Sequence, residues 1–184
     1  MNESLGSLAD RIAALSEQAG GRLPPVDSWQ PALSGDIDIR ITAAGEWLHE
    51  GRPFQRAALV KLFASILRRD GDAYFLVTPA EKWRIAVEDV PFKVIGLERL
   101  SGDDGQALLF ETTTGDRVAA GPAHPLRVAV SGPDDEPRPY LAIRGGMEGL
   151  LSRAVYVELC ELAEAALEGG GWGVISNGTF FLLA

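Results

Sequence analysis

One turn of the chain brings together three side chains with different chemistry. In "VTPAEKW", residues 77–83, Thr78 carries a hydroxyl, Glu81 a carboxylate and Lys82 an ammonium group. Thr-Pro at the first two positions favours a type I turn, in which Thr78 or Glu81 bonds backbone amides. The corresponding turn near the end of the chain, "SNG", has no such set, and its Asn-Gly suits a type I′ hairpin. Two interpretations stay open: a turn bonded to itself, or a ligand or partner contact made by Thr78, Glu81 and Lys82.

A second candidate is the segment "IRGGMEG", residues 143–149. It predicts a strand that ends at Arg144, a glycine pair, and a helix that begins near Met147 or Glu148. The first N–H groups of a helix have no internal partner and suit a phosphate group, and an arginine adds a bidentate donor. Glu148 counts against this site because it places a carboxylate at the same helix end, and the glycine pair also suits a simple hinge. The candidate ligand-binding residues here are Arg144, Gly145 and Gly146.

Positive charges complete the predicted site. We expect Lys82 and Arg144 to help form an anion-binding surface where the two halves of the chain meet. Arg56 and Arg153 are added as candidates because they coincide when the chain is aligned with itself at a shift of 97 positions.

The sequence offers no convincing set of catalytic or metal-binding residues. His49 and His124 are far apart and belong to no metal-ligand spacing, and there is neither a Walker loop nor a dinucleotide fingerprint. We therefore predict no metal and name no cofactor, and we expect the protein not to be an enzyme. Cys160, the single cysteine, aligns with Phe63 in the internal comparison and is predicted to lie in the apolar core.

The composition limits the partners. The 184 residues carry a net charge of −9, and residues 101–184 contain twelve acids and five bases. Nucleic-acid binding depends on neutralising phosphates, so an acidic second half argues against it. No apolar run approaches the roughly 20 residues that cross a bilayer, and a single cysteine fits a reducing compartment. We expect a cytoplasmic protein that contacts neither nucleic acid nor membrane.

Hydrophobic periodicity predicts an α+β fold with mainly antiparallel sheet. The expected elements are a helix over 5–15, a linker over 21–31, hairpins over 36–51 and 73–87 around a helix over 54–69 that ends at Gly71, strands at 91–100, 106–113 and 116–121, and hairpins over 126–144 and 172–184 around a helix over 148–168.

The order hairpin, helix, hairpin occurs twice, which indicates a duplication. The predicted repeats are residues 36–87 and 125–184. The predicted domains are an N-terminal helix and linker over 1–35, a first α+β repeat domain over 36–122 and a second over 123–184.

Several segments resemble the uncharacterised proteobacterial family called domain of unknown function 1285. They are "VDSWQP", "GDIDIRI", "GEWLHEGRPFQRAALVKLFASILRRD", "YFLVTPAEKWRIAVEDVPF" and "IRGGMEGLLSRAVYVELCELA", and the likeness spans about residues 24–182. The resemblance implies a duplicated core whose second domain is similar to pleckstrin-homology folds. It also implies a nucleotide-like ligand in a groove between the domains and a role in signal transduction, and it implies no enzymatic activity.

Taken together, the sequence favours a non-enzymatic regulatory protein that binds a small anionic, nucleotide-like ligand between its two halves. The alternative is a protein-protein interaction module without a small-molecule ligand, which would use sheet edges or the N-terminal helix.

Overall fold

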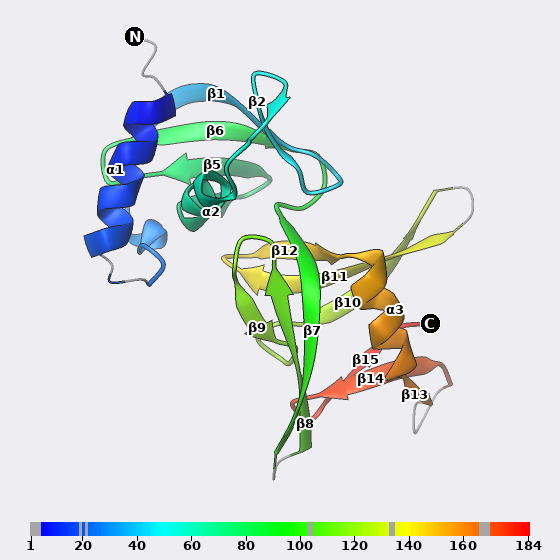
Figure 1. Cartoon of the computed structure of the whole chain (residues 1–184). Helices are drawn as coiled ribbons and strands as arrows, with labels where there is room; N and C mark the ends of the chain where they lie inside the picture. Colours follow the sequence, from blue (N-terminus) through cyan, green and yellow to red (C-terminus); the bar gives the residue numbers. More distant parts are fainter. Residues whose placement is uncertain (1–4, 19, 21, 103–104, 133–134, 166–169) are drawn as a thin grey trace. The chain divides into compact units, whose positions relative to one another are not determined.

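The computed structural model describes residues 5–18, 20, 22–102, 105–132, 135–165 and 170–184 of the chain (Figure 1). The chain divides into two compact units, Met1–Asp89 and Val90–Ala184. The predicted boundary after residue 122 lies elsewhere, because the strands expected between 91 and 121 pair with strands of the second half. No helix among these residues is long and apolar enough to cross a membrane.

The first unit contains two α-helices, a short 3₁₀ helix and one mixed sheet. Its elements are α1 (Leu5–Gln18), η1 (Val26–Ser28), β1 (Leu33–Ile41), β2 (Trp47–His49), β3 (Arg52–Pro53), α2 (Ala57–Ser65), β4 (Leu67–Asp70), β5 (Ala73–Val77) and β6 (Lys82–Val87).

The sheet of the first unit consists of two antiparallel three-stranded meanders joined side by side. The strand order is β3-β2-β1-β6-β5-β4, and the joining pair, β1 with β6, is parallel. One face is apolar and contributes the buried side chains of Ile39, Ile41, Leu76 and Ile85 to the core. Helix α1 buries Leu8 and Ile12 on its inward side and packs against α2. Both predicted hairpins of this half, and the N-terminal helix, are confirmed.

The predicted helix over 54–69 is too long at both ends. Helix α2 ends at Ser65, and the chain continues as β4, in which Leu67 pairs with Leu76 of β5. Gly71, with φ 60°, belongs to the turn between β4 and β5 and does not cap the helix. The apolar residues Ile66 and Leu67 are compatible with the periodicity of a helix and with that of a strand. The pairing of Leu67 with Leu76 decides in favour of a strand.

The described residues of the second unit form a mixed six-stranded sheet, one helix and a small three-stranded sheet. Its elements are β7 (Phe92–Gly102), β8 (Gly105–Thr112), β9 (Arg117–Ala119), β10 (Leu126–Ser131), β11 (Glu136–Arg144), β12 (Met147–Leu151), α3 (Arg153–Glu161), β13 (Glu164–Ala165), β14 (Trp172–Ser176) and β15 (Thr179–Leu182).

The two sheets of the second unit are tied together by a buried serine. The large sheet has the order β10-β11-β12-β7-β8-β9, and the small sheet has the order β13-β14-β15. The Ser176 hydroxyl accepts a bond from the Leu108 N–H at 2.8 Å and donates to the Ala120 carbonyl at 2.7 Å.

The strand pairing of both units confirms the α+β class and the mainly antiparallel sheet, with one parallel pair in each six-stranded sheet.

The helix predicted over 148–168 is wrong over residues 148–152 and 162–165, and its residues 166–168 lie outside the described part of the chain. Residues Met147–Leu151 form strand β12, and Gly145 and Gly146, with φ of 56° and 71°, make the turn between β11 and β12. Helix α3 begins only after Ser152, whose hydroxyl caps it by accepting a bond from the Val155 N–H. The predicted helix start at Met147 or Glu148 is therefore wrong, and the helix N–H groups on which the predicted phosphate site rested do not lie at these residues.

Cys160 is exposed, so its predicted place in the core is wrong. The buried side of α3 is formed by Val155 and Leu159, which are four residues apart. The residue after Leu159 is turned by about 100° around the helix axis and faces solvent.

The structure contains a repeat of sheet topology, but with other boundaries than predicted. Residues 36–87 and 125–184 share an order of elements, yet β13–β15 form a separate sheet while β4–β6 join the strands before them. Adding six to each strand number of the first sheet instead converts its order into that of the second large sheet. The matching segments are residues 33–87 and 92–151.

We predict that Gly149→Ala destabilises the second unit. Gly149 lies opposite Phe92 in the parallel pair of β12 with β7, and an added Cβ would come within 3.1–3.3 Å of Val94, Phe92 and Ile143. Such overpacking costs about 1–3 kcal/mol. Urea unfolding of the variant measures the loss.

Gly96→Ala, in β7, is the matched control, because its Cβ would meet only Glu111 at an ordinary 3.5 Å. This control should be neutral or gain up to about 1 kcal/mol. Equal stabilities for the two variants would contradict the close packing of the parallel pair.

Candidate functional site

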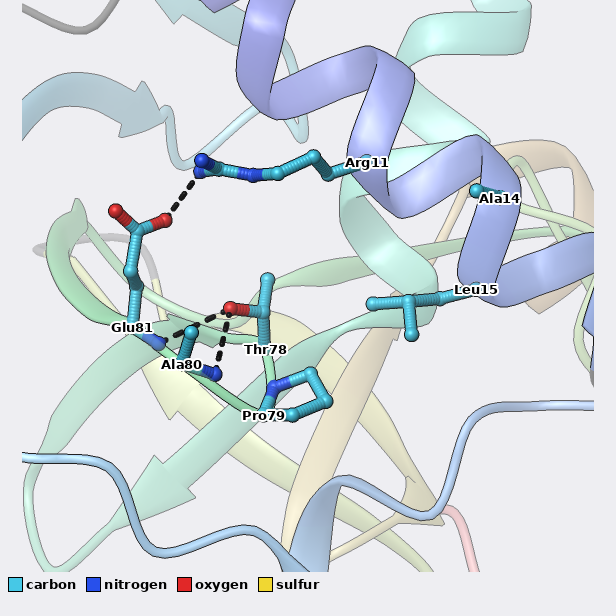
Figure 2. A pocket seen from close by; sticks show the side chains of 7 residues that line it. All are labelled: Arg11, Ala14, Leu15, Thr78, Pro79, Ala80 and Glu81. Atoms are coloured by element: carbon cyan, nitrogen blue, oxygen red, sulfur yellow. Dashed lines mark hydrogen bonds and ion pairs between the residues drawn. The ribbon is translucent and has the colours of Figure 1, made fainter.

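A pocket of about 520 Å³ lies inside the first unit, between α1 and the turn that joins β5 to β6 (Figure 2). Its volume falls within the range of roughly 300–1,000 Å³ that is usual for small-molecule sites. The residues that line it are Arg11, Ala14, Leu15, Thr78, Pro79, Ala80 and Glu81. The turn singled out by its chemistry therefore forms one wall of a cavity, and helix α1 forms the other.

Thr78 builds the turn. Its N–H donates to the Glu81 carbonyl at 2.9 Å, and its hydroxyl oxygen accepts bonds from the N–H groups of Glu81 and Ala80 at 3.1 and 3.4 Å. The side chain is buried, with 4% exposure. The self-bonded interpretation of the turn is therefore confirmed for Thr78.

Glu81 reaches out of the turn and forms an ion pair with Arg11 of α1 (Figure 2). The Arg11 side chain is 45% exposed and that of Glu81 is 20% exposed. Because solvent screens such a pair, it contributes only about 0–1 kcal/mol to stability. The pair links the two walls of the pocket and places two opposite charges at its rim, beside the apolar surfaces of Leu15 and Pro79.

Arg11 is the residue that sequence reasoning missed. It lies seventy positions before Glu81, on a helix that was predicted only from its apolar stripe. Because Leu8 and Ile12 are buried, the neighbouring positions Arg11 and Leu15 border the contact between helix and sheet. That position is the one signal in the sequence that could have indicated Arg11.

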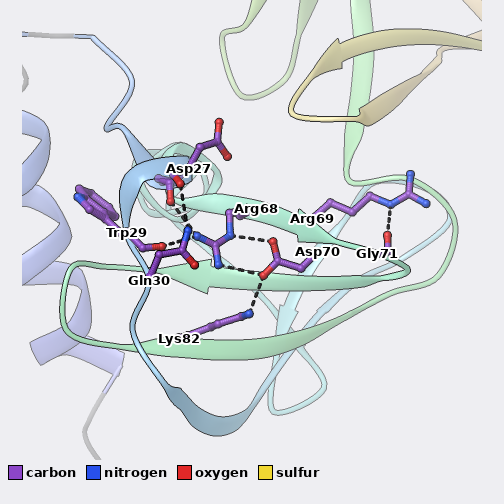
Figure 3. Close-up of polar contacts among 9 residues, drawn as sticks. Asp27, Trp29, Gln30, Arg68, Arg69, Asp70, Gly71 and Lys82 are labelled. Atoms are coloured by element: carbon purple, nitrogen blue, oxygen red, sulfur yellow. Dashed lines mark hydrogen bonds and ion pairs between the residues drawn. The ribbon is translucent and has the colours of Figure 1, made fainter.

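Lys82 belongs to a different cluster, because it does not line the pocket and lies on the face of the sheet that carries Asp70 and Phe75. Its Nζ lies 2.6 Å from Oδ2 of Asp70 (Figure 3). The same atom lies 4.1 Å from the ring centre of Phe75. Asp70 also binds Arg68, whose Nε lies 2.9 Å from Oδ1. The hydrogen bond from Arg68 is the main cause of a lowered pKa of Asp70; burial opposes it, and Lys82 lowers the pKa further.

Arg68 fastens the linker to the sheet. Its guanidinium is buried and donates to the carbonyls of Val26 and Trp29 at 2.9 and 2.6 Å (Figure 3). Two carbonyls and a carboxylate thus satisfy a charge that would be costly to bury alone. Lys82, through Asp70, supports this anchor.

Arg144 has a similar structural role in the second unit. Its Nε lies 2.7 Å from Oδ1 of Asp116, and its guanidinium lies 4.9 Å from the ring centre of Phe92. The hydroxyls of Thr112 and Thr114 donate to the other carboxylate oxygen at 3.1 and 2.7 Å. Burial raises the pKa of Asp116, but the Arg144 charge and these hydrogen bonds outweigh it, and the net pKa lies below its usual value.

The remaining charged candidates each lie at the start of a helix. Arg56 is exposed at the start of α2, and Arg153 is exposed at the start of α3. Of the eight predicted site residues, the structure brings Thr78 and Glu81 together in the pocket. Within the part of the chain that is described, no three His, Cys, Asp or Glu side chains are grouped so that they could hold a metal ion.

We predict that Asp116→Asn lowers the free energy of unfolding at neutral pH. We also predict that this free energy then decreases less steeply as the pH falls. A carboxylate with a depressed folded-state pKa stabilises above the unfolded value of about 3.9, and this contribution disappears as pH falls through the folded-state pKa. Losing the charge opposite Arg144 should cost about 1.5–3 kcal/mol at pH 7. Urea unfolding between pH 7 and pH 2 measures both effects.

Asp72→Asn is the control, since that side chain is fully exposed in its ion pair with Arg69. Its curve should follow the wild type. A pH dependence unchanged by Asp116→Asn would contradict the assigned role of Asp116.

Comparison with known proteins places the chain among bacterial proteins of unknown function. Residues 24–90 match the model described as "Domain of unknown function (DUF1285), N-terminal domain", and residues 91–183 match "Protein of unknown function (DUF1285), C-terminal domain". The junction of the two matches lies within one residue of the division between the units. No protein with a curated description matches.

Two crystal structures are similar to this chain. A DUF1285 family protein from Silicibacter pomeroyi DSS-3 is 42% identical, with a TM-score of 0.82, over 88% of this chain and 87% of that one. A DUF1285 family protein from Shewanella baltica OS155 is 32% identical, with a TM-score of 0.52, over 66% of this chain and 89% of that one. The matches to both domain models and the likeness to the first structure show that the chain belongs to the DUF1285 family, as its sequence motifs predict.

Proposed function

We propose that this protein is a non-enzymatic regulator that binds a small anionic, nucleotide-like ligand in the pocket between α1 and the Thr78–Glu81 turn. The observation that carries the proposal is the Arg11–Glu81 pair at the rim of a cavity of about 520 Å³. A signalling role and a pleckstrin-homology-like second unit belong to the same proposal and are supported by the family resemblance.

The lining of the pocket defines the kind of ligand. Ala14, Leu15, Pro79 and Ala80 offer apolar surface to a flat ring. Arg11 carries a planar guanidinium with five N–H donors, which suits a phosphate or carboxylate group. Glu81 accepts hydrogen bonds from ligand hydroxyl groups. A compound with an apolar ring, hydroxyls and one anionic group matches the apolar surface, the carboxylate of Glu81 and the guanidinium of Arg11.

Two cations expected at the site have other partners. Lys82 is neutralised by Asp70 and Arg144 by Asp116. An anion that bound Lys82, Arg144 or Arg11 would have to compete with a carboxylate already in place, which for Arg11 is Glu81. We centre the proposed site on Arg11 because its side chain is the most exposed of the three, at 45% against 19% for each of the other two, so that solvent weakens its ion pair most.

We predict that a matching nucleotide raises the melting temperature of the full chain. A ligand at about 100 times its Kd adds roughly 2.7 kcal/mol, which for a protein of this size is a shift of about 5–10 °C. The measurement is a thermal-shift screen with AMP, cyclic AMP, adenosine and inorganic phosphate. Arg11→Ala should remove most of the shift for the charged compounds.

Two further variants make the screen decisive. Ala14→Phe fills the pocket without changing its charge and should abolish binding, whereas Arg52→Ala removes an exposed arginine of β3 and should leave binding unchanged. If no compound shifts the wild type, the proposed function fails. If a compound shifts the wild type, Arg11→Ala and Ala14→Phe equally, the pocket is not its site.

A further inference from the structure

The small sheet of the second unit exposes apolar side chains on its outer face. Along β14 and β15 the inward residues Val174, Ser176 and Phe181 are buried, while Ile175, Phe180 and Leu182 are 39%, 38% and 55% exposed. Alternation of this kind usually places polar side chains on the solvent face of an antiparallel sheet. Here the outer positions are apolar, which is typical of a face that another molecule covers.

The strand register makes these side chains neighbours. Ile175 lies opposite Phe180 and Gly173 lies opposite Leu182, so all four positions share one face. The Phe180 ring covers Gly173, since a Cβ on that glycine would lie 2.4 Å from the ring. Leu182 covers Gly171 in the same way, at 2.6 Å from a Cβ placed there. The two glycines thus allow the apolar side chains to lie flat and form one continuous surface.

The charge beside this surface is negative. Glu164 of β13 lies opposite Gly173 and therefore on the same face, in one row with Leu182. Residues 154–184 contain four glutamates and no Lys, Arg or His. A second copy of the chain would bring the same acids against each other, and an anionic lipid or nucleic-acid surface would be repelled as well. The complementary partner carries positive charge.

The width of the face matches one helix. Three strands at a spacing of about 4.8 Å span roughly 10 Å between the outer two, and a helix with its side chains is about 10–12 Å across. We infer that the outer face of β13–β15 is a docking surface for a basic amphipathic helix of a partner protein. The apolar stripe of the partner's helix covers Ile175, Phe180 and Leu182, and a Lys or Arg of that helix beside the stripe pairs with Glu164.

The test uses defined peptides and the full chain. A helical peptide of about 18 residues with a leucine stripe flanked by lysines is titrated into isotope-labelled protein, and the same design with glutamates in place of lysines is the charge control. The lysine peptide should bind, with the largest NMR shift changes at Ile175, Phe180 and Leu182. The glutamate peptide should not bind.

Three variants locate the contact. Ile175→Ser combined with Leu182→Ser should weaken binding about tenfold or more, and Glu164→Lys should weaken it while leaving the apolar face intact. Ile95→Ser, which removes an apolar side chain of β7 with 51% exposure, should have no effect. An unchanged melting temperature shows that each variant is folded.

Other outcomes overturn the inference. Binding that survives the double variant, shift changes that lie outside the small sheet, or equal binding of both peptides would show that this face is not a specific dock for a basic helix. Concentration-dependent self-association with the same residues protected would assign the face to a second copy. None of these results bears on the pocket beside α1, so the two proposals fail separately.

Discussion

The parallel pairing of the first and last strands holds each large sheet together. Without the pair of β1 with β6, the first sheet would be two separate three-stranded meanders, and the same holds for β7 with β12 in the second. Both pairs include a glycine, Gly35 opposite Trp83 and Gly149 opposite Phe92. A Cβ placed on Gly35 would meet Trp83 at an ordinary 3.4 Å, and one placed on Gly149 would meet side chains at a tighter 3.1–3.3 Å. A side chain packed against a glycine in the joining pair is thus common to the two units.

This constraint decides which residues are available for function. The first pair fixes β6 at the centre of its sheet, which holds the turn between β5 and β6 at the sheet end where α1 packs. Buried Arg68 then ties the linker to the same sheet through Val26 and Trp29. Because the linker is anchored, α1 lies beside the turn, and Arg11 forms an ion pair with Glu81. The pocket is therefore a consequence of where the linker is fastened.

The small sheet and α1 share one property: neither is part of a six-stranded sheet. Only α1 lies before residue 24, where the match to the N-terminal domain model begins. The Thr78–Glu81 wall of the pocket lies inside that match and the Arg11 wall lies outside it. Because added elements are not needed to close either large sheet, they are the parts of the chain that the fold leaves available for partners and ligands.

Local sequence signals predicted the hairpins and the class of fold. Alternating side chains and turn residues such as Asn177-Gly178 identify strands within a few positions, because those signals act over short distances. They failed at Ile66–Leu67 and at Met147–Leu151, where both a helix and a strand are compatible with the sequence pattern. In both places distant partners decide: Leu76 for the first, and β7 for the second.

The site was predicted in part, for the same reason. The chemistry of the turn marked Thr78 and Glu81, and its alternative interpretation, a self-bonded turn, also proved correct for Thr78. Arg11 was not inferred, because only the fold brings it to the turn, and its position beside the apolar stripe of α1 does not by itself identify Glu81 as its partner. Lys82 and Arg144 were chosen for their charge, and the sequence does not show that Asp70 and Asp116 neutralise them.

Hydrogen exchange of the backbone amides tests the central claim that each unit is held by its parallel pair and that α1 is an added wall. We predict that the most slowly exchanging amides lie in β6, β7 and β12, and that the amides of α1 exchange faster through local opening. An α1 as strongly protected as these strands, or joining strands that exchange as fast as the edge strands β3 and β9, would contradict the account.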